Sequence, residues 1–288
     1  MRRTVIALAA LSILAGCAVI VVPDGEGGVH YKSAFSSDAV QGNGQNATET
    51  RQVAALDAID VNGPMQVEIR VGQGTSLQVE GDSNILPLLR TDASSGTLRV
   101  WVDGNVRTSH PLRVTYTTPT LRQVDSNGSG AMNISGLSGG PLSLALNGSR
   151  AVRVSGYVAN LDVRMNGSGG LNASGLDSSA IAARVSGSGR LTLGRVNGDQ
   201  LNLELNGSGG ANASGSVRNM TVRTNGSGSA DLASLTSQTA ELNTNGSGSI
   251  SAAVTQSVVA AANGSGRVTV YGNPSQRNVS GKHVSFVQ

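Results

Sequence analysis

The stretch LNLELNGSGGANA, residues 201–213, places an apolar side chain at every second position on both sides of the tetrapeptide Asn-Gly-Ser-Gly. Alternation with a period of two is typical of a β-strand that buries one face. Gly, and to a lesser degree Asn, enters the positive-φ region at low cost, so the tetrapeptide favours a tight turn. The stretch therefore predicts a strand, a tight turn and a second strand.

The tetrapeptide, or a near match, begins eight times at intervals of 18 to 20 residues. Gly in second place and Ser in third place occur in every copy, and the fourth Gly is missing once, where Arg150 stands. In most copies the same apolar alternation flanks the turn. The copies begin at Asn127, Asn147, Asn166, Ser186, Asn206, Asn225, Asn245 and Asn263. A unit of about 20 residues cannot bury its apolar face alone, so the units must stack on one another.

Two stacked arrangements fit this pattern: successive coils of a parallel β-helix, and an antiparallel meander of hairpins. In a coil, each position stacks on its own copy every ~4.8 Å, which gives a reason for identical turn residues to recur. Stacked Asn side chains can also hydrogen-bond along the axis. We therefore predict an all-β fold, a parallel β-helix or β-solenoid with coils of about 20 residues, and we interpret the repeated turns as structural.

The regular repeats are expected over residues 121–272, with shorter and less regular strands before them. Alternating segments predict strands at 65–71, 77–80, 97–102 and 112–116, and Pro87 limits any helix near residues 84–90 to about one turn. The last residues, 278–288, leave the repeat, and we expect them to cap the last coil as terminal units of repeat proteins do.

The amino-terminal residues predict an export signal. A basic start at Arg2 and Arg3 precedes an apolar segment that ends in Leu14-Ala15-Gly16-Cys17, and Cys17 is the single cysteine of the chain. This ending resembles the lipobox of bacterial lipoproteins, which implies a signal peptide over residues 1–16 and a lipid on Cys17. The alternative is an uncleaved anchor, since the 18 residues from Val5 to Val22 are just long enough to span a membrane.

Residues 17–50 carry no hydrophobic period and are expected to form a flexible tether behind the lipidated cysteine. The lipid would attach the protein to the membrane of a bacterial cell envelope. Ala18 follows the cysteine, and the resemblance to lipoproteins implies that a residue other than Asp at this place permits transfer to the outer membrane.

The alternating strands around the repeated turns, with Val270-Tyr271-Gly272-Asn273-Pro274 near the end and Pro119-Thr120-Leu121 before the first copy, resemble the head GIN domain family of auto-transporter adhesins. The resemblance covers roughly residues 52–288, and we assign residues 51–288 to a GIN-like β-solenoid domain. It implies a β-helical, exported and commonly lipid-anchored protein. The family brings no catalytic residue to this chain.

Several classes of function are not expected. Aromatic residues are 2% of the chain and the basic and acidic residues nearly balance, so no stacking platform or basic stripe points to nucleic acid. The three His residues are scattered, and we expect no metal and no cofactor. Among enzymes, a carbohydrate-active β-helix is the strongest alternative. Such an enzyme needs a pair of carboxylates, but Glu204 lies among cations rather than beside a second carboxylate.

We therefore expect a non-catalytic, exported cell-envelope lipoprotein, with two roles left open. In the first, the solenoid is an adhesin-like binding module for a glycan, an envelope component or a protein, and Arg164, Arg184 and Arg223 form a possible binding face. In the second, the protein maintains the envelope without a ligand of its own.

Overall fold

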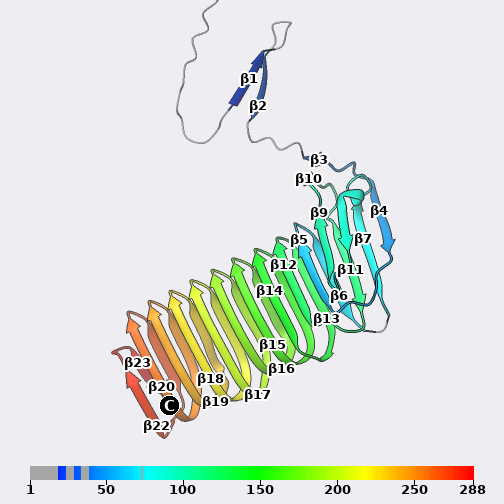
Figure 1. Ribbon diagram of the computed structural model, residues 1–288. Helices are drawn as coiled ribbons and strands as arrows, with labels where there is room; N and C mark the ends of the chain where they lie inside the picture. The colour runs from blue at the N-terminus through cyan, green and yellow to red at the C-terminus, as the bar shows by residue number, and fades with distance from the viewer. Residues whose placement is uncertain (1–18, 24–28, 34–38, 73) are drawn as a thin grey trace, which may run out of the picture.

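The computed structural model is a β-solenoid of about 8 turns, in which strands stack side by side along a straight rod (Figure 1). The structure describes residues 19–23, 29–33, 39–72 and 74–288. Successive coils pair in parallel throughout the repeat region, as in the register of Leu201 with Met220 and of Asn206 with Asn225. The predicted parallel solenoid is confirmed, and the antiparallel meander is excluded.

Each regular coil runs from one Asn-Gly-Ser-Gly turn to the next almost entirely in extended conformation. The strands of this part are β12 (Gln123–Gly128), β13 (Ala131–Gly139), β14 (Leu142–Gly148), β15 (Ala151–Gly167), β16 (Gly170–Gly187), β17 (Arg190–Gly207), β18 (Gly210–Gly226), β19 (Ser229–Gly246), β20 (Ser249–Gly264) and β21 (Arg267–Tyr271). We call the segments that follow the turns the post-turn wall, and those that precede the next turns the pre-turn wall.

A second bend separates the two walls within each coil. Between β17 and β18 the register shifts between Thr192 and Arg195, and β18 bends at Gly215, where φ is +119°. Similar shifts recur between the other long strands. This second turn is less regular than the tetrapeptide turn because its sequence varies from coil to coil.

The core lies between the two walls and consists of the inward side chains predicted from the alternation. In the pre-turn wall of β17, Leu201, Leu203 and Leu205 are buried, and in its post-turn wall Leu191 and Leu193 are buried. Burial of a side chain of this size contributes roughly 1.5–3 kcal/mol, and each coil can realise it only against its neighbours.

The amino-terminal end has the same coil geometry with a large insertion. Strands β5 (Ala58–Asn62) and β6 (Gln66–Val71) pair in parallel with β12 and β13 and so form the first coil. The inserted elements are β7 (Ser76–Asp82), the 3-10 turn η1 (Leu86–Leu88), β8 (Leu89–Asp92), β9 (Leu98–Val102), β10 (Val106–Arg107) and β11 (Arg113–Thr118). Antiparallel pairs β7–β11 and β8–β9 close this end of the rod.

The segment expected as a tether contains four strands. They are β1 (Val19–Pro23), β2 (Val29–Ser33), β3 (Val40–Gln41) and β4 (Asn46–Arg51). β1 pairs with β2, and β4 pairs antiparallel with β7, so the folded domain begins before residue 51. The run of β-branched residues in β1 favours a strand, whereas β4 joins the sheet through its backbone and needs no apolar period. Cys17 and the predicted signal peptide over residues 1–16 lie outside the described residues.

The carboxyl-terminal end continues the stack. β22 (Gln276–Ser280) pairs in parallel with β20, and β23 (Val284–Val287) pairs in parallel with β21. The residues expected to cap the rod therefore lie on it as one further coil rather than across its end. None of the helical residues that the structure describes forms a segment long and apolar enough to cross a membrane.

Candidate functional site

The turn asparagines form a ladder along the rod. Each side-chain amide nitrogen donates to the amide oxygen in the preceding coil at 2.8–3.2 Å, in the pairs Asn127–Asn62, Asn147–Asn127, Asn166–Asn147, Asn225–Asn206, Asn245–Asn225 and Asn263–Asn245. Ser186 interrupts the ladder, and Asn206 donates to Glu204 at 2.9 Å instead. Because these amides satisfy one another, the column is a structural feature of the rod.

The glycine in second place of each turn has a conformation that other residues rarely adopt. Gly207 has φ +120°, and a Cβ built there would lie 2.6 Å from the carbonyl oxygen of Gly187 in the preceding coil. That carbonyl accepts hydrogen bonds from the backbone of Ser208 and Gly209 at 2.9 and 3.0 Å. Only glycine fits both the positive φ and the close stacking of neighbouring turns.

Arg150, which replaces the fourth glycine of one turn, is buried. Its guanidinium reaches two coils back, where Nη2 donates to the carbonyl of Gly63 at 2.7 Å and Nη1 donates to the carbonyl of Met65. Burial lowers the pKa of this guanidinium. Asn62 and Gly63, with φ +116° at Gly63, form an earlier turn of the same stack, and Arg150 supplies hydrogen bonds to it.

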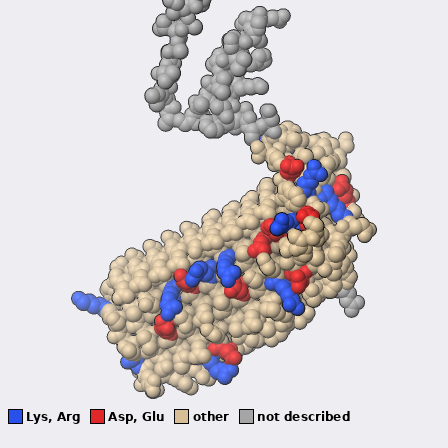
Figure 2. All heavy atoms as spheres, in the orientation of Figure 1, with Lys and Arg blue, Asp and Glu red and all other residues tan. Residues whose placement is uncertain are grey.

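The three arginines singled out from the sequence lie together on the outer surface of the pre-turn wall. Arg164, Arg184, Glu204 and Arg223 stand at one register position in four successive coils. Arg184 donates from Nε and Nη2 to Glu204 at 2.9 and 2.5 Å. In Figure 2, basic and acidic side chains follow one another in a row along this face.

The other two arginines also have carboxylate partners. Arg223 donates to Glu241 at 2.7 Å in the next coil, and Nη2 of Arg164 lies 3.3 Å from an oxygen of Asp162 in its own strand. The row thus holds three cations and three anions, and its formal charge is zero. We call it the ion-pair row.

A shallow groove of about 520 Å³ runs beside the ion-pair row across strands β15 to β19. Its floor is the neighbouring register position, where Ala182, Asn202 and Thr221 carry short side chains. Asp162 and Glu241 occupy the same position in the coils at the two ends. The long side chains of the row therefore stand along one side of a floor that spans roughly 19 Å over four strand spacings.

The electrostatics of Glu204 do not suit acid catalysis. The hydrogen bond from Asn206 lowers the pKa of Glu204, and the hydrogen bond and charge of Arg184 and the charge of Arg223 lower it further. A general acid for glycoside hydrolysis needs a raised pKa and a second carboxylate across the bond that is cleaved. Along its column, Glu204 instead has an arginine on each side. This arrangement does not favour Glu204 as a general acid.

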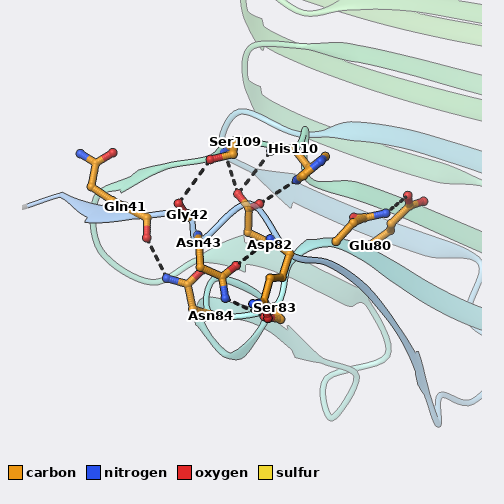
Figure 3. A network of polar contacts seen from close by, with 11 residues as sticks. Gln41, Gly42, Asn43, Glu80, Asp82, Ser83, Asn84, Ser109 and His110 are labelled. Carbon is orange, nitrogen blue, oxygen red and sulfur yellow. Dashed lines mark hydrogen bonds and ion pairs between the residues drawn. The ribbon is translucent and has the colours of Figure 1, made fainter.

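A second polar cluster lies at the amino-terminal end and fastens the link between β3 and β4 (Figure 3). Asp82 is buried and accepts hydrogen bonds from the backbone of Ser109 at 2.6 Å and from Nδ1 of His110 at 2.9 Å. These bonds, that of His110 first, lower the pKa of Asp82. Nearby, the backbone N–H of Asn43 donates to Asn84 at 2.9 Å. We call this cluster the Asp82 clasp.

Some of these features have only weak signals in the sequence. Asn62-Gly63 belongs to the repeated turn, but Pro64 stands where Ser is expected and 65 residues separate Asn62 from Asn127. The alternation of Ile59 and Val61 before it is the signal that could have identified it. The partner of Arg223 lies on a diagonal between two register columns, and period-two patterns do not reveal diagonal contacts.

The comparisons with known proteins agree with this architecture. The model of a family described as "Putative auto-transporter adhesin, head GIN domain" matches residues 55–180 and 174–274. None of the curated proteins matches the chain.

Several solved structures share the fold. A putative lipid binding protein from Parabacteroides distasonis is 22% identical, with a TM-score of 0.63 over 87% of this chain and 100% of the other. A putative adhesin from Parabacteroides merdae is 20% identical, with a TM-score of 0.66 over 87% and 99%. A putative adhesin from Parabacteroides distasonis is 18% identical, with a TM-score of 0.61 over 87% and 100%. At these identities the likeness shows the fold.

Proposed function

Since the chain belongs to the "Putative auto-transporter adhesin, head GIN domain" family, we propose that it is a non-catalytic, adhesin-like protein of the bacterial cell envelope that binds a glycan along the ion-pair row. In this proposal the chain is exported, processed before Cys17 and held in the outer membrane by lipid on that cysteine. The adhesin-like family and the solenoid fold support a role in contact with other surfaces.

The observation that carries the binding proposal is the groove beside the ion-pair row. Its arginines are largely exposed, and the side chains of Arg164 and Arg184 have 63% and 62% of their surface accessible. Their carboxylate partners hold them in place, so a ligand meets groups that are already oriented. Prior orientation reduces the entropy that binding must overcome.

The chemistry of the groove matches a neutral ligand rich in hydroxyl groups. Each hydroxyl of a sugar can donate to a carboxylate and accept from a guanidinium, so it complements ion pairs of both signs. An anionic or a cationic ligand would gain little from a row whose charges cancel. Acyl chains are also poor partners, because the lining carries many polar groups that would lose water without forming new hydrogen bonds.

Glycan arrays with the detergent-solubilised full chain test the binding proposal. The double variant Arg184→Ala, Arg223→Ala should lose the captured glycans, because charged hydrogen bonds contribute roughly 1.5–3 kcal/mol each. Arg218→Ala is the matched control, since Arg218 also pairs with a carboxylate of the preceding coil, Asp199, but lies in the second turn. Capture that survives the double variant would refute this site, and silence on the array and in envelope pull-downs would favour the envelope-maintenance role.

The lipid anchor is tested separately. Cys17→Ser should abolish incorporation of labelled palmitate and cleavage by the lipoprotein signal peptidase, and it should move the protein out of the outer-membrane fraction. Two acyl chains suffice for stable attachment at about 0.8 kcal/mol per buried CH₂. A Cys17→Ser protein that is still labelled and cleaved at this position would contradict the anchor.

A further inference from the structure

A second groove, of about 510 Å³, lies on the outer surface of the post-turn wall near the amino-terminal end. It crosses strands β11, β6, β13 and β15, whereas the ion-pair row lies on the pre-turn wall of β15 to β19. We call it the Arg153 groove. The side chains that face it are Gln66, Glu68, Arg113, Ala131, Asn133, Ala151 and Arg153.

The floor of the Arg153 groove consists of short side chains at one register position. Ala131 and Ala151 are exposed neighbours in this column, and Gln66 and Arg113 continue it toward the amino-terminal end. The adjacent column holds Glu68, Asn133 and Arg153 in three successive coils. The two arginines therefore stand at opposite ends of a floor to which Gln66 contributes an amide and Ala131 and Ala151 contribute methyl groups.

The charges of this groove do not cancel as those of the ion-pair row do. Two arginines and one glutamate face it, an excess of one positive charge. Glu68 already accepts from Arg70, which lies outside the lining, at 3.0 and 2.8 Å. Arg113 lies 3.7 Å from Glu80 and donates to the amide of Gln66 at 3.3 Å. Within the described residues, the guanidinium of Arg153 has neither an ion pair nor a hydrogen bond.

We infer that the Arg153 groove binds an acidic glycan through a sugar carboxylate held by Arg153. The planar guanidinium fork matches a carboxylate with two parallel hydrogen bonds, and no carboxylate of the described residues occupies it. Asn133 and Gln66 can bond to hydroxyl groups, and the alanine floor can pack against the apolar face of a sugar ring. This site goes beyond the proposed function, because it lies on the other wall and requires an anion.

Calorimetric titration of the detergent-solubilised full chain with trigalacturonate, and with the neutral trisaccharide galactotriose, tests the inference. Trigalacturonate should bind and galactotriose should not, and the affinity should fall as salt increases. Arg153→Gln should weaken binding roughly 10- to 100-fold. Arg153→Lys keeps the charge but loses the fork, and its loss should be intermediate.

Arg267→Gln is the matched control. Arg267 lies at the register position of the alanine floor, at the other end of the same wall, and is exposed. Its loss should leave trigalacturonate binding unchanged, as should the ion-pair variant Arg184→Ala, Arg223→Ala. Unchanged binding in the ion-pair variant would show that the two sites are independent. Failure of the proposed function at the ion-pair row would then leave the Arg153 groove unaffected.

Three results would overturn the inference: no binding of trigalacturonate, equal binding of galactotriose, or unchanged affinity in Arg153→Gln. Phosphatidylglycerol vesicles form a further arm of the experiment, with phosphatidylcholine vesicles as the neutral comparison. If the anionic vesicles bind through Arg153 and trigalacturonate does not bind, the groove binds lipid headgroups, and the inference of an acidic glycan is overturned. Equal urea midpoints for wild type and Arg153→Gln ensure that folding does not explain the result.

Discussion

At the scale of single residues, the stacking of the coils depends on glycines that no other residue can replace without strain. The second glycine of each turn combines a positive φ with a carbonyl oxygen of the preceding coil directly beside its missing side chain. Glycines of the second turn, such as Gly156 and Gly215, lie equally close to a carbonyl oxygen of the preceding coil, but Leu176 and Leu235 occupy the same register positions in the next coils. Only the first turn therefore keeps this constraint in every copy.

Gly207→Val should therefore lower the free energy of unfolding clearly more than Ser216→Val. The positive φ alone costs roughly 1–2 kcal/mol for a residue with a Cβ, and a β-branched side chain costs more. Ser216 is exposed in the second turn and provides the control. Urea unfolding measures both, and hydrogen exchange should show loosening of the turns at Gly187 and Gly226. Equal urea midpoints for Gly207→Val and wild type would contradict the strained, stacked turn.

Arg150→Gly restores the repeated tetrapeptide, yet it should destabilise the protein. The variant removes the hydrogen bonds to the carbonyl groups of Gly63 and Met65, and a buried group left unsatisfied costs roughly 1–3 kcal/mol. Denaturant midpoints decide the matter, with Arg190→Gly as a control because Arg190 is exposed and begins a strand. If Arg150→Gly is more stable than the wild type, the regular tetrapeptide stabilises the turn by more than the two hydrogen bonds of Arg150 do.

The sequence predicts only some of these residue-scale features. The recurring Asn and Gly predicted the turn and the hydrogen-bonded ladder, because stacking in register makes identical residues neighbours. Arg150 seemed only an exception to the repeat, since its partners lie 85 and 87 positions away. The sequence also gives no sign that the guanidinium of Arg153 lacks a partner among the described residues, because a missing partner has no local pattern.

At the scale of elements, the repeated strands could be predicted and the edge strands could not. β4 has the sequence NATETR, in which no apolar period appears, and it is held by backbone bonds to β7. The Asp82 clasp then fixes the segment that leads into β4. A strand that joins an edge through backbone bonds and polar side-chain bonds, such as those of Arg51 to the carbonyl groups of Leu86 and Leu89, shows no hydrophobic period in its sequence.

The Asp82 clasp predicts an acid-sensitive amino-terminal end. The folded state lowers the pKa of Asp82, so its stabilisation is present above the ordinary carboxylate pKa and is lost as pH falls through that value toward the folded pKa. When the pH is lowered from about 5 to about 3, the urea midpoint of the wild type should therefore decrease more than that of Asp82→Asn. Asp177→Asn, which changes an exposed carboxylate, should retain the wild-type pH dependence. Identical pH profiles for Asp82→Asn and wild type would contradict the role of the clasp.

At the scale of the whole molecule, the two ends of the rod differ. Antiparallel strands close the amino-terminal end, whereas β22 and β23 leave their outer edges open, with Val279 and Val287 each 42% exposed. The sequence indicated a change of pattern after residue 277, and Phe286 suggested a cap. In the structure, Phe286 packs against the core from a further parallel coil.

Deletion of residues 278–288 should lower the unfolding midpoint and produce soluble oligomers. The deletion uncovers residues 259–261 of β20 and residues 268–271 of β21, whose regular strand edges can then pair with another chain. Light scattering and thermal unfolding measure the two effects. A monodisperse truncation with the wild-type midpoint would show that the last coil contributes nothing to closing the stack.

Because each coil stacks in register on the one about 20 residues before it, any folded stretch of the rod can act as a template for the coil beside it. Everything that positions a new coil is already folded when its residues arrive, provided that the chain is delivered amino end first. The finished part then acts as a template, and its growth front advances toward the carboxyl terminus one coil at a time.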